Sequence, residues 1–316
     1  MASKEYLKCP FSSLFVVRKM SPRPNPSHIK AGKIAARVRD EICEVLKPGT
    51  KIYSLCTMAE KKIIDYGGQP AFPCTISYNH FTAHYTSPIG DPMVLPDDAM
   101  VKVDVGVHVE GYIADTARTI DLSGDLEGFA IATDDALHEA IQMMRPGTNL
   151  GDVGKTIESI IKTYGLKPIK NLSGHNIERY RLHAGKTVPN VKTRTGDVVE
   201  VGECYAVEPY ATNGTGSVID SDLVYIFSNI PKDDPLTGST EKLRLHLRKK
   251  YGPFPFTSRW IGTTTKDIDI VKELSVLLKH QYIKGYPVQL TKKRRPSSQS
   301  EHTVFITEQD PIVLTR

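Results

Sequence analysis

The sequence predicts an α/β fold made of two pseudo-symmetric halves, and three observations support this prediction. A helix, a Pro-Gly turn, a second helix and a short strand occur in that order twice along the chain. Three landmarks of the first copy recur 98 positions later: Pro48 as Pro146, Tyr66 as Tyr164 and Pro70 as Pro168. Asp104 and Glu208 each end a short apolar strand and lie 104 positions apart. Two such halves place their chemistry at the seam between them.

Length and composition are those of a globular protein. The chain has 316 residues, enough for one large domain or two ordinary ones, with 40% hydrophobic and 24% charged residues. These values exclude a disordered or fibrous chain. The net charge of +5 is too small to indicate specific binding to DNA or to a membrane surface.

The cysteines and the apolar runs predict a cytoplasmic protein. The 5 cysteines are scattered, without a C-x-x-C pair, so neither a disulfide framework nor a thiolate zinc site is expected. No apolar run reaches the roughly 18 residues that a membrane span needs. The stretch Phe11 to Val17 is too short for the apolar core of a signal peptide.

The N-terminal part predicts a leader followed by two helices. Residues 1–26 are expected to be a flexible leader, because the proline-rich end of this stretch disfavours helix and central strand. A helix is predicted from Ser27, with Ser27 as its N-cap. Pro48-Gly49 ends that helix, and a second helix runs to about Tyr66.

A β-hairpin is predicted next, with two carboxylates on one face. Residues 101–109 alternate between valine and mostly polar residues, and Glu110-Gly111 is a natural two-residue turn into a returning strand. This register pairs Asp104 with Ala117 and makes Asp115 its diagonal neighbour, roughly 7–8 Å away. A solvated polar face is the simpler interpretation of two acids alone. Their apolar neighbours instead favour carboxylates that need a partner.

The C-terminal part predicts an inserted helical unit. Two amphipathic helices, Ser239 to Tyr251 and Asp267 to Tyr282, have no counterpart in the repeat. We therefore expect a catalytic domain over 27–316, with an inserted subdomain at about 235–285. A polar, basic loop over Lys292 to Ser300 is expected to lead into a last strand from His302.

Further candidates for chemistry lie at similar strand ends. His175, Glu208 and Glu301 each stand beside an apolar strand, and each alone is ambiguous. Together with Asp104 and Asp115 they form an oxygen-rich set that suits a pair of divalent cations such as Co, Mn, Fe or Zn. His84 and His183 occupy nearly equivalent points of the two halves and are candidates for substrate contacts, although either alone is more often an ordinary half-buried histidine.

Seven ordered motifs resemble those of type II methionine aminopeptidases, most closely the short archaeal-like forms. The resemblance covers about residues 28–316, and it implies the pita-bread fold, with the insertion at about 235–285 as the type II helical subdomain. The motifs are Ala83-His-Tyr-Thr86, Lys102-Val-Asp-Val-Gly106, Ala114-Asp-Thr-Ala117, Leu172-Ser-Gly-His175, Leu182-His-Ala-Gly185, Val207-Glu-Pro209 and Glu301-His-Thr303.

The resemblance implies a role for each matching residue. Glu208 would be both a ligand and the general base, and His84 and His183 would contact the substrate. Phe72 would line the methionine pocket. The five ligands of two metal ions would be Asp104, Asp115, His175, Glu208 and Glu301, with Asp115 and Glu301 bridging the ions.

The implied activity is removal of the initiator methionine from nascent polypeptides whose second residue is small, by a monomer in the cytoplasm. The sequence departs from the family pattern at Asn79 to Thr82, at Ser300, which replaces an aromatic residue, and in the loop Arg294 to Ser300. None of these departures removes a ligand.

Two other functions compete with this interpretation. Prolidases and Xaa-Pro aminopeptidases share the five ligands, but they usually carry a larger N-terminal domain, for which there is no room before Ile29. The second competing function is that of a relative that has lost the metal ligands and binds RNA or ribosomal proteins. Such a protein would have no reason to keep all five metal ligands. The basic run Lys292 to Arg295 leaves contact with the ribosome open, although such a run is more often a solvated loop.

Overall fold

The computed structural model describes residues 22–262 and 269–316. The candidate signal stretch and most of the predicted leader lie outside the described residues. The first helix begins at Pro26, not after it, and its N-cap is Asn25, whose side chain accepts a hydrogen bond from the Ser27 backbone N–H. The prediction of Ser27 as the cap is wrong because proline is well suited to the first position of a helix.

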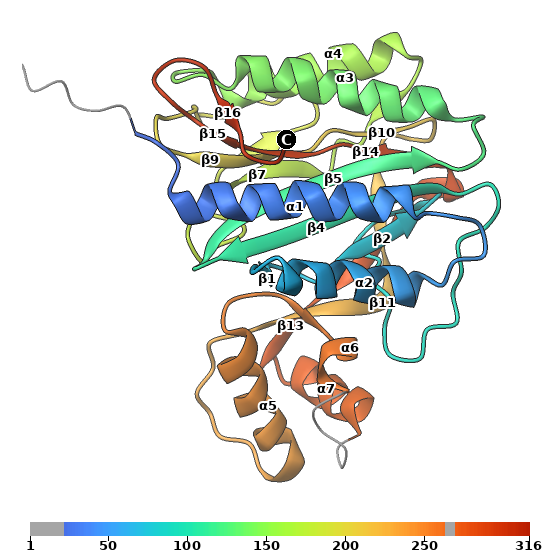
Figure 1. Cartoon of the computed structure of the whole chain (residues 1–316), viewed down its shortest axis with the longest axis vertical. Helices are drawn as coiled ribbons and strands as arrows, with labels where there is room; N and C mark the ends of the chain where they lie inside the picture. The colour runs from blue at the N-terminus through green and yellow to red at the C-terminus, as the bar shows by residue number, and fades with distance from the viewer. Residues whose placement is uncertain (1–21, 263–268) are drawn as a thin grey trace, which may run out of the picture.

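The first half packs two helices on one face of a four-stranded sheet that contains the predicted β-hairpin (Figure 1). The valines at 101, 103, 105 and 107 share a core with these helices, as the alternation predicts. Its elements are α1 (Pro26–Glu44), α2 (Ile52–Asp65), β1 (Gln69–Pro70), β2 (Thr75–Tyr78), β3 (Phe81–Ala83), β4 (Met100–Val109) and β5 (Tyr112–Asp121). β4 pairs with β1, β2 and β5.

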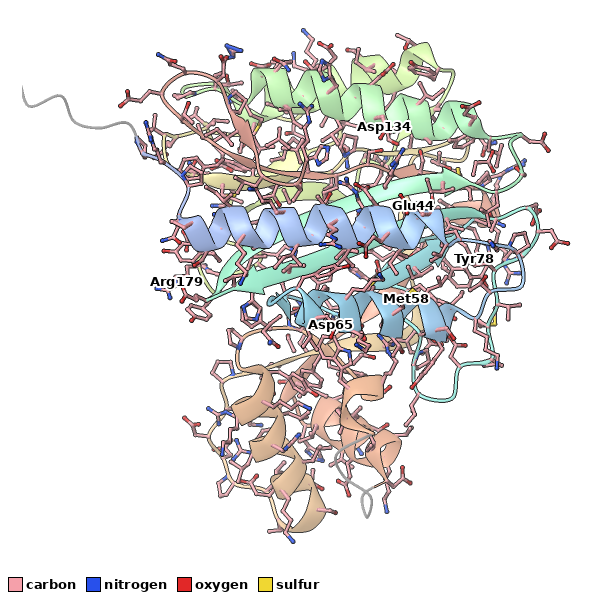
Figure 2. All side chains as sticks on the ribbon, viewed as in Figure 1. Glu44, Met58, Asp65, Tyr78, Asp134 and Arg179 are labelled. Atoms are coloured by element: carbon pink, nitrogen blue, oxygen red, sulfur yellow. The ribbon has the colours of Figure 1, made fainter. Side chains whose placement is uncertain are left out.

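The opposite face of the hairpin is not solvated. Lys102 is fully buried and donates from Nζ to the backbone carbonyls of Ser297, at 2.9 Å, and Asn79, at 3.2 Å. At the hairpin turn, Arg179 (Figure 2) donates from Nε to the Glu110 carbonyl at 2.8 Å. Both faces of β4 are therefore covered, the second one by the other half of the molecule.

The second half repeats the first. α4 begins and ends 98 positions after α2, and β6 lies 98 positions after β1. Five strands form a sheet in the order β16-β15-β9-β7-β8, and three form another in the order β14-β10-β6. The elements are α3 (Glu127–Met143), α4 (Leu150–Thr163), β6 (Lys167–Pro168), β7 (Ser173–Ile177), β8 (Thr187–Pro189), β9 (Cys204–Val207), β10 (Tyr210–Thr212), β14 (Ser297–Gln299), β15 (His302–Phe305) and β16 (Ile312–Val313). The predicted duplication is confirmed.

The helical insertion lies at one end of the molecule (Figure 1), between two strands that pair with each other. It has its own apolar core, which includes Leu243, Leu247 and Leu274. The helix predicted over Asp267 to Tyr282 spans Ile270 to Lys279, and residues 263–268 lie outside the described part. The elements are β11 (Val218–Asn229), α5 (Gly238–Tyr251), β12 (Phe256–Thr257), α6 (Ser258–Ile261), α7 (Ile270–Lys279) and β13 (Ile283–Thr291). We propose residues 27–316 as the catalytic domain and about 235–285 as its inserted subdomain.

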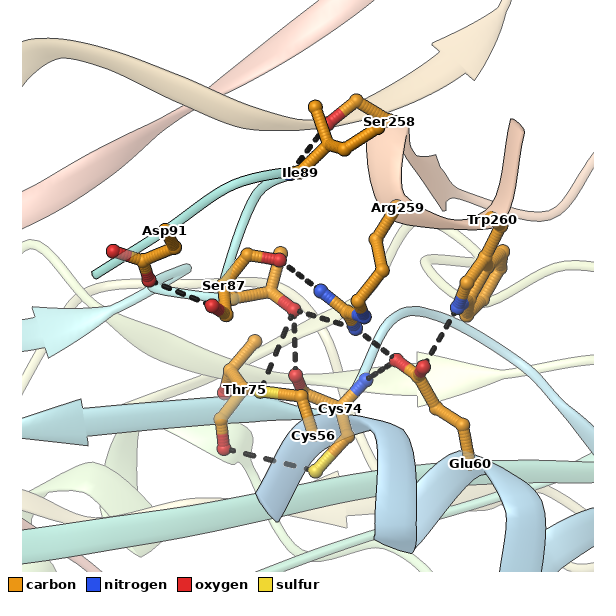
Figure 3. A network of polar contacts seen from close by, with 11 residues as sticks. Cys56, Glu60, Cys74, Thr75, Ser87, Ile89, Asp91, Ser258, Arg259 and Trp260 are labelled. Atoms are coloured by element: carbon orange, nitrogen blue, oxygen red, sulfur yellow. Dashed lines mark hydrogen bonds and ion pairs between the residues drawn. The ribbon is translucent and has the colours of Figure 1, made fainter. Parts of the chain in front are cut away.

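A buried polar network joins the insertion to the first half (Figure 3). Arg259 of α6 forms an ion pair with Glu60 of α2, and Trp260 Nε1 donates to the same carboxylate at 2.8 Å. The Cys74 backbone N–H also donates to Glu60, at 3.2 Å. The insertion is thus fixed to the segment that runs from α2 into β2.

One predicted loop is partly a strand. Lys292 to Arg295 is exposed as expected, but Ser297 to Gln299 forms β14 and is buried against β10. The polar composition of this segment does not predict a strand. Its hydrogen-bonding partners come from distant parts of the chain, so the prediction of a polar, basic loop is wrong for Ser297 to Gln299.

Candidate active site

The two hairpin carboxylates have the predicted register. Asp104 lies opposite Ala117, and Asp115 lies opposite Gly106, so the two acids are diagonal neighbours on one face. Asp115 is buried, whereas Asp104 keeps some accessibility from the pocket. The face on which they lie is the one covered by the second half.

His175 reaches the same place from β7. The preceding Gly174 is part of the strand and has no room for a side chain, because a Cβ there would lie 2.3 Å from the Ala206 carbonyl oxygen. His175 Nε2 lies 3.7 Å from Asp115 Oδ2 and 3.7 Å from Glu208 Oε1. The histidine therefore stands between a carboxylate of each half.

Glu208 and Glu301 complete the cluster from two further strand ends. Glu208 follows β9, which pairs with both β7 and β15. Glu301 lies between β14 and β15, and its backbone forms a bridge with Ala117 of β5. This bridge joins the two halves directly beside the carboxylates.

All eight predicted site residues line one pocket at the seam between the halves. The polar members come from both copies of the repeat, and the apolar members include Leu182, Ile226 and Pro255. Pro255 comes from the insertion. The eight are Phe72, His84, Asp104, Asp115, His175, His183, Glu208 and Glu301.

The cluster has the chemistry of a cation site. Burial raises the pKa of Asp104 to about 7 and that of Glu208 to about 8. Burial, and then the charges of neighbouring carboxylates, raise the pKa of Asp115 and of Glu301 well above their ordinary values. Four carboxylates in one buried pocket repel one another unless protons or cations offset their charge.

Unpartnered oxygens offer ligand positions to a cation. Asp104 Oδ1, Asp115 Oδ1 and Glu301 Oε1 are buried without a hydrogen-bond partner. Ligand atoms of Asp115, His175 and Glu301 lie within 4.8 Å of one another, close enough to hold one ion. Carboxylate oxygens with one imidazole nitrogen suit Mn, Fe, Co or Zn, so the residues fit a divalent metal.

The two remaining histidines lie at the pocket wall. His84 has a positive φ of 65°, and its Nδ1 lies 3.0 Å from the Pro287 carbonyl oxygen. A carbonyl only accepts, so Nδ1 carries the proton and Nε2 is an acceptor in the neutral ring. Burial lowers the pKa of His84 and favours that neutral form. His183 is more exposed, and its ring centroid is 4.2 Å from that of His175.

The position of the Phe72 ring depends on Gly106. A Cβ at Gly106 would lie 2.1 Å from Phe72 Cε1, so the ring occupies the space that a side chain on β4 would fill. Gly106 lies opposite Asp115. The Phe72 ring therefore lies beside the position on β4 that pairs with Asp115.

Sequence reasoning missed several residues in or beside the pocket. Gln299 donates to Glu301 Oε2 at 3.2 Å, and Tyr210 donates to Glu208 Oε2 at 2.8 Å. Each lies two positions from the carboxylate that it contacts. Pro255 of the insertion and Tyr286 of β13 also line the pocket, but no local signal marks them because only folding brings these segments to the pocket.

Comparison with known proteins gives consistent matches. Residues 27–228 match the family model described as metallopeptidase family M24. The chain is 41% identical to a methionine aminopeptidase of Methanocaldococcus jannaschii over 91% of this chain and 97% of that protein.

Two solved structures are similar in fold. A thermophilic Arx1 has a TM-score of 0.78 at 17% identity, over 91% of this chain and 89% of the other. A methionine aminopeptidase from Thermotoga maritima has a TM-score of 0.67 at 23% identity, over 94% and 100%. At these identities the likeness is one of fold.

Proposed function

Because this chain belongs to metallopeptidase family M24, and within it to the methionine aminopeptidases, we propose that it removes the N-terminal methionine from polypeptides whose second residue is small. The family resemblance seen in the motifs and the two-halved fold are confirmed. The observation that carries the proposal is the convergence of five potential ligands, with three unpartnered carboxylate oxygens, in one pocket. Nascent polypeptide N-termini are the proposed partners.

The metal site is proposed to hold two divalent ions. Asp104, Asp115, His175, Glu208 and Glu301 would be the ligands, since all five line the pocket. Such ions acidify water and polarise a carbonyl, which is the chemistry that peptide hydrolysis requires.

Glu208 is proposed as the general base. Its Oε2 accepts from Tyr210, so Oε1 is the oxygen that can take a proton from the attacking water. Buried surroundings raise the pKa of this carboxyl to about 8.

The two histidines are proposed to divide the substrate's polar groups between them. His84 Nε2 is an acceptor, so it suits an N–H of the scissile amide. His183 would then donate to the carbonyl oxygen of the scissile peptide bond, which becomes negative in the transition state. The apolar wall of Phe72, Leu182 and Ile226 would hold the methionine side chain.

The setting of the enzyme is also proposed. All site residues come from one chain, so a monomer suffices. A reducing cytoplasm fits the cysteines of the described part, Cys43, Cys56, Cys74 and Cys204, which are free and buried. Within that part, no helix has both the length and the apolar character to cross a membrane.

The exposed run Lys292 to Arg295 is proposed as a ribosome contact on its charge alone. Such a contact should weaken with rising salt and be lost on charge reversal of the run. Ribosome sedimentation that is unchanged by both treatments rejects it.

Methionine release from Met-Gly-Met, compared with cleavage of Xaa-Pro peptides, tests the activity. We expect release of methionine and no Xaa-Pro cleavage. Glu208→Gln should lower turnover by at least about a hundredfold with the fold intact. His84→Ala should lower turnover while bound metal, measured by elemental analysis, is retained. Near-normal activity of either variant contradicts the role given to that residue.

A further inference from the structure

Tyr210 stands beside the proposed base and is unexplained by any ligand or substrate role. Its side chain is only 3% exposed, and it lines the pocket. Its hydroxyl donates to Glu208 Oε2 at 2.8 Å. A buried phenol needs such a partner, and here the partner is the carboxylate on which the proposed chemistry depends.

The backbone holds this contact in place. Tyr210 begins β10, the central strand of the sheet β14-β10-β6, and lies directly opposite Gln299 of β14. Pro209, between Glu208 and Tyr210, fixes its own φ, and its carbonyl accepts from the Ser300 N–H at 3.3 Å. The hydroxyl is thus placed by strands paired on both sides.

The two oxygens of Glu208 have different surroundings. Oε2 accepts from Tyr210, and Oε1 lies 3.7 Å from His175 Nε2. The two oxygens of Glu301 also have different surroundings, because Oε2 accepts a hydrogen bond from Gln299 whereas Oε1 has no hydrogen-bond partner. The cross-strand pair Tyr210 and Gln299 therefore provides one neutral donor for each glutamate.

We propose that Tyr210 is a positioning residue that holds Glu208 with Oε2 engaged and Oε1 presented to the pocket, an inference that rests on the proposed function. A neutral donor orients the carboxylate without cancelling its charge, whereas a lysine or arginine there would cancel it. Without the hydroxyl, Oε2 would lose its partner, and the carboxylate would be free to rotate away from the orientation in which Oε1 faces the pocket.

Tyr210→Phe tests this proposal, because it removes one oxygen atom and keeps the ring. Tyr205→Phe is the matched control: Tyr205 is fully buried in β9 and its hydroxyl donates to Glu203, outside the pocket. Three quantities are measured for both variants and the wild type: Mn²⁺ affinity by calorimetric titration, kcat and KM on Met-Gly-Met, and the melting temperature of the metal-free protein.

We expect Tyr210→Phe to weaken Mn²⁺ binding or to lower kcat by about 10- to 100-fold, the usual effect of losing a partner of a metal ligand. KM should change little, because the hydroxyl orients the base and not the methionine. Tyr205→Phe should leave Mn²⁺ affinity and kcat near the wild-type values.

Wild-type Mn²⁺ affinity and kcat in Tyr210→Phe would overturn the proposal. So would equal losses in the two tyrosine variants, since these would reflect the general cost of removing a buried hydroxyl. A wild-type chain that binds Mn²⁺ but releases no methionine would contradict the proposed function instead. The Mn²⁺ comparison of the two variants would then still decide the role of Tyr210.

Discussion

Arg259 and Glu60 form a buried ion pair across 199 positions of sequence, and this pair joins the helical insertion to helix α2. The side chains are 3% and 8% exposed. The same short segment of the insertion supplies Pro255 to the pocket wall. The pair therefore helps to determine where that wall stands.

Breaking this ion pair should destabilise the protein. Removing one partner leaves an uncompensated buried charge, so Arg259→Met and Glu60→Leu should each lower the free energy of unfolding by about 3–5 kcal/mol. The double variant should cost less than the sum of the two, as measured by urea denaturation. Lys61→Met, which breaks an exposed ion pair on the same helix, is the control and should cost at most about 1 kcal/mol. Additive effects of the two buried substitutions would show that the pair is not coupled.

The metal-free protein should lose stability as the pH rises above about 6.5. The folded-state pKa is about 7 for Asp104 and about 8 for Glu208, against ordinary values of 3.8 and 4.5. Between these limits the folded chain binds more protons than the unfolded chain, so the free energy of unfolding falls with rising pH. Denaturation in a chelator from about pH 6.5 to about pH 8, a range in which the buried histidines are neutral in the folded chain and largely neutral in the unfolded chain, measures this slope.

Added Mn²⁺ should flatten that pH dependence, because a cation replaces the protons in offsetting the carboxylate charges. Asp115→Asn should also reduce the slope, since it removes one of the four acids. A metal-free protein whose stability is constant over this range would contradict the picture of a repulsive cluster.

Gly106→Ala should disturb the pocket more than the strand. The new methyl group would occupy the space of the Phe72 ring, and overpacking of this kind costs typically about 1–3 kcal/mol. We expect a higher KM for Met-Gly-Met from steady-state kinetics, because the displaced ring lines the pocket. Gly128→Ala is a matched control, since a Cβ there meets no atom within 4 Å. An unchanged KM in Gly106→Ala would reject the proposed role of Phe72 in the methionine slot.

His108 should make the protein sensitive to acid. It stacks on Phe254 with ring centroids 4.1 Å apart, and burial lowers its pKa from 6.5 to about 4. Below the unfolded-state value the unfolded chain binds the proton first, so stability falls as the pH drops from 6.5 towards 4. His108→Phe keeps the stacking and removes the titration. As the pH drops from 6.5 towards 4, the free energy of unfolding of His108→Phe should therefore rise relative to that of the wild type. A difference between the two proteins that does not change with pH would contradict the lowered pKa of His108.

The local patterns of the sequence determined much of this architecture. The period of two in residues 101–109 and the two-residue turn at Glu110-Gly111 were enough to predict that Asp104 pairs with Ala117. The duplication predicted helix α4 and strand β6 as copies of α2 and β1, because the same turn residues recur at the same spacing. The seven motifs then indicated the family.

Only the tertiary structure decided the contacts that join distant segments. Ser297 to Gln299 is too polar to be recognised as a strand, and it becomes one because β10 supplies its hydrogen bonds. The pairing of Arg259 with Glu60 likewise depends on helices that only folding brings together. The physical reason is that periodicity and turn chemistry act between near neighbours, whereas the burial of a polar group and the choice of its partner are settled only when the core closes around it.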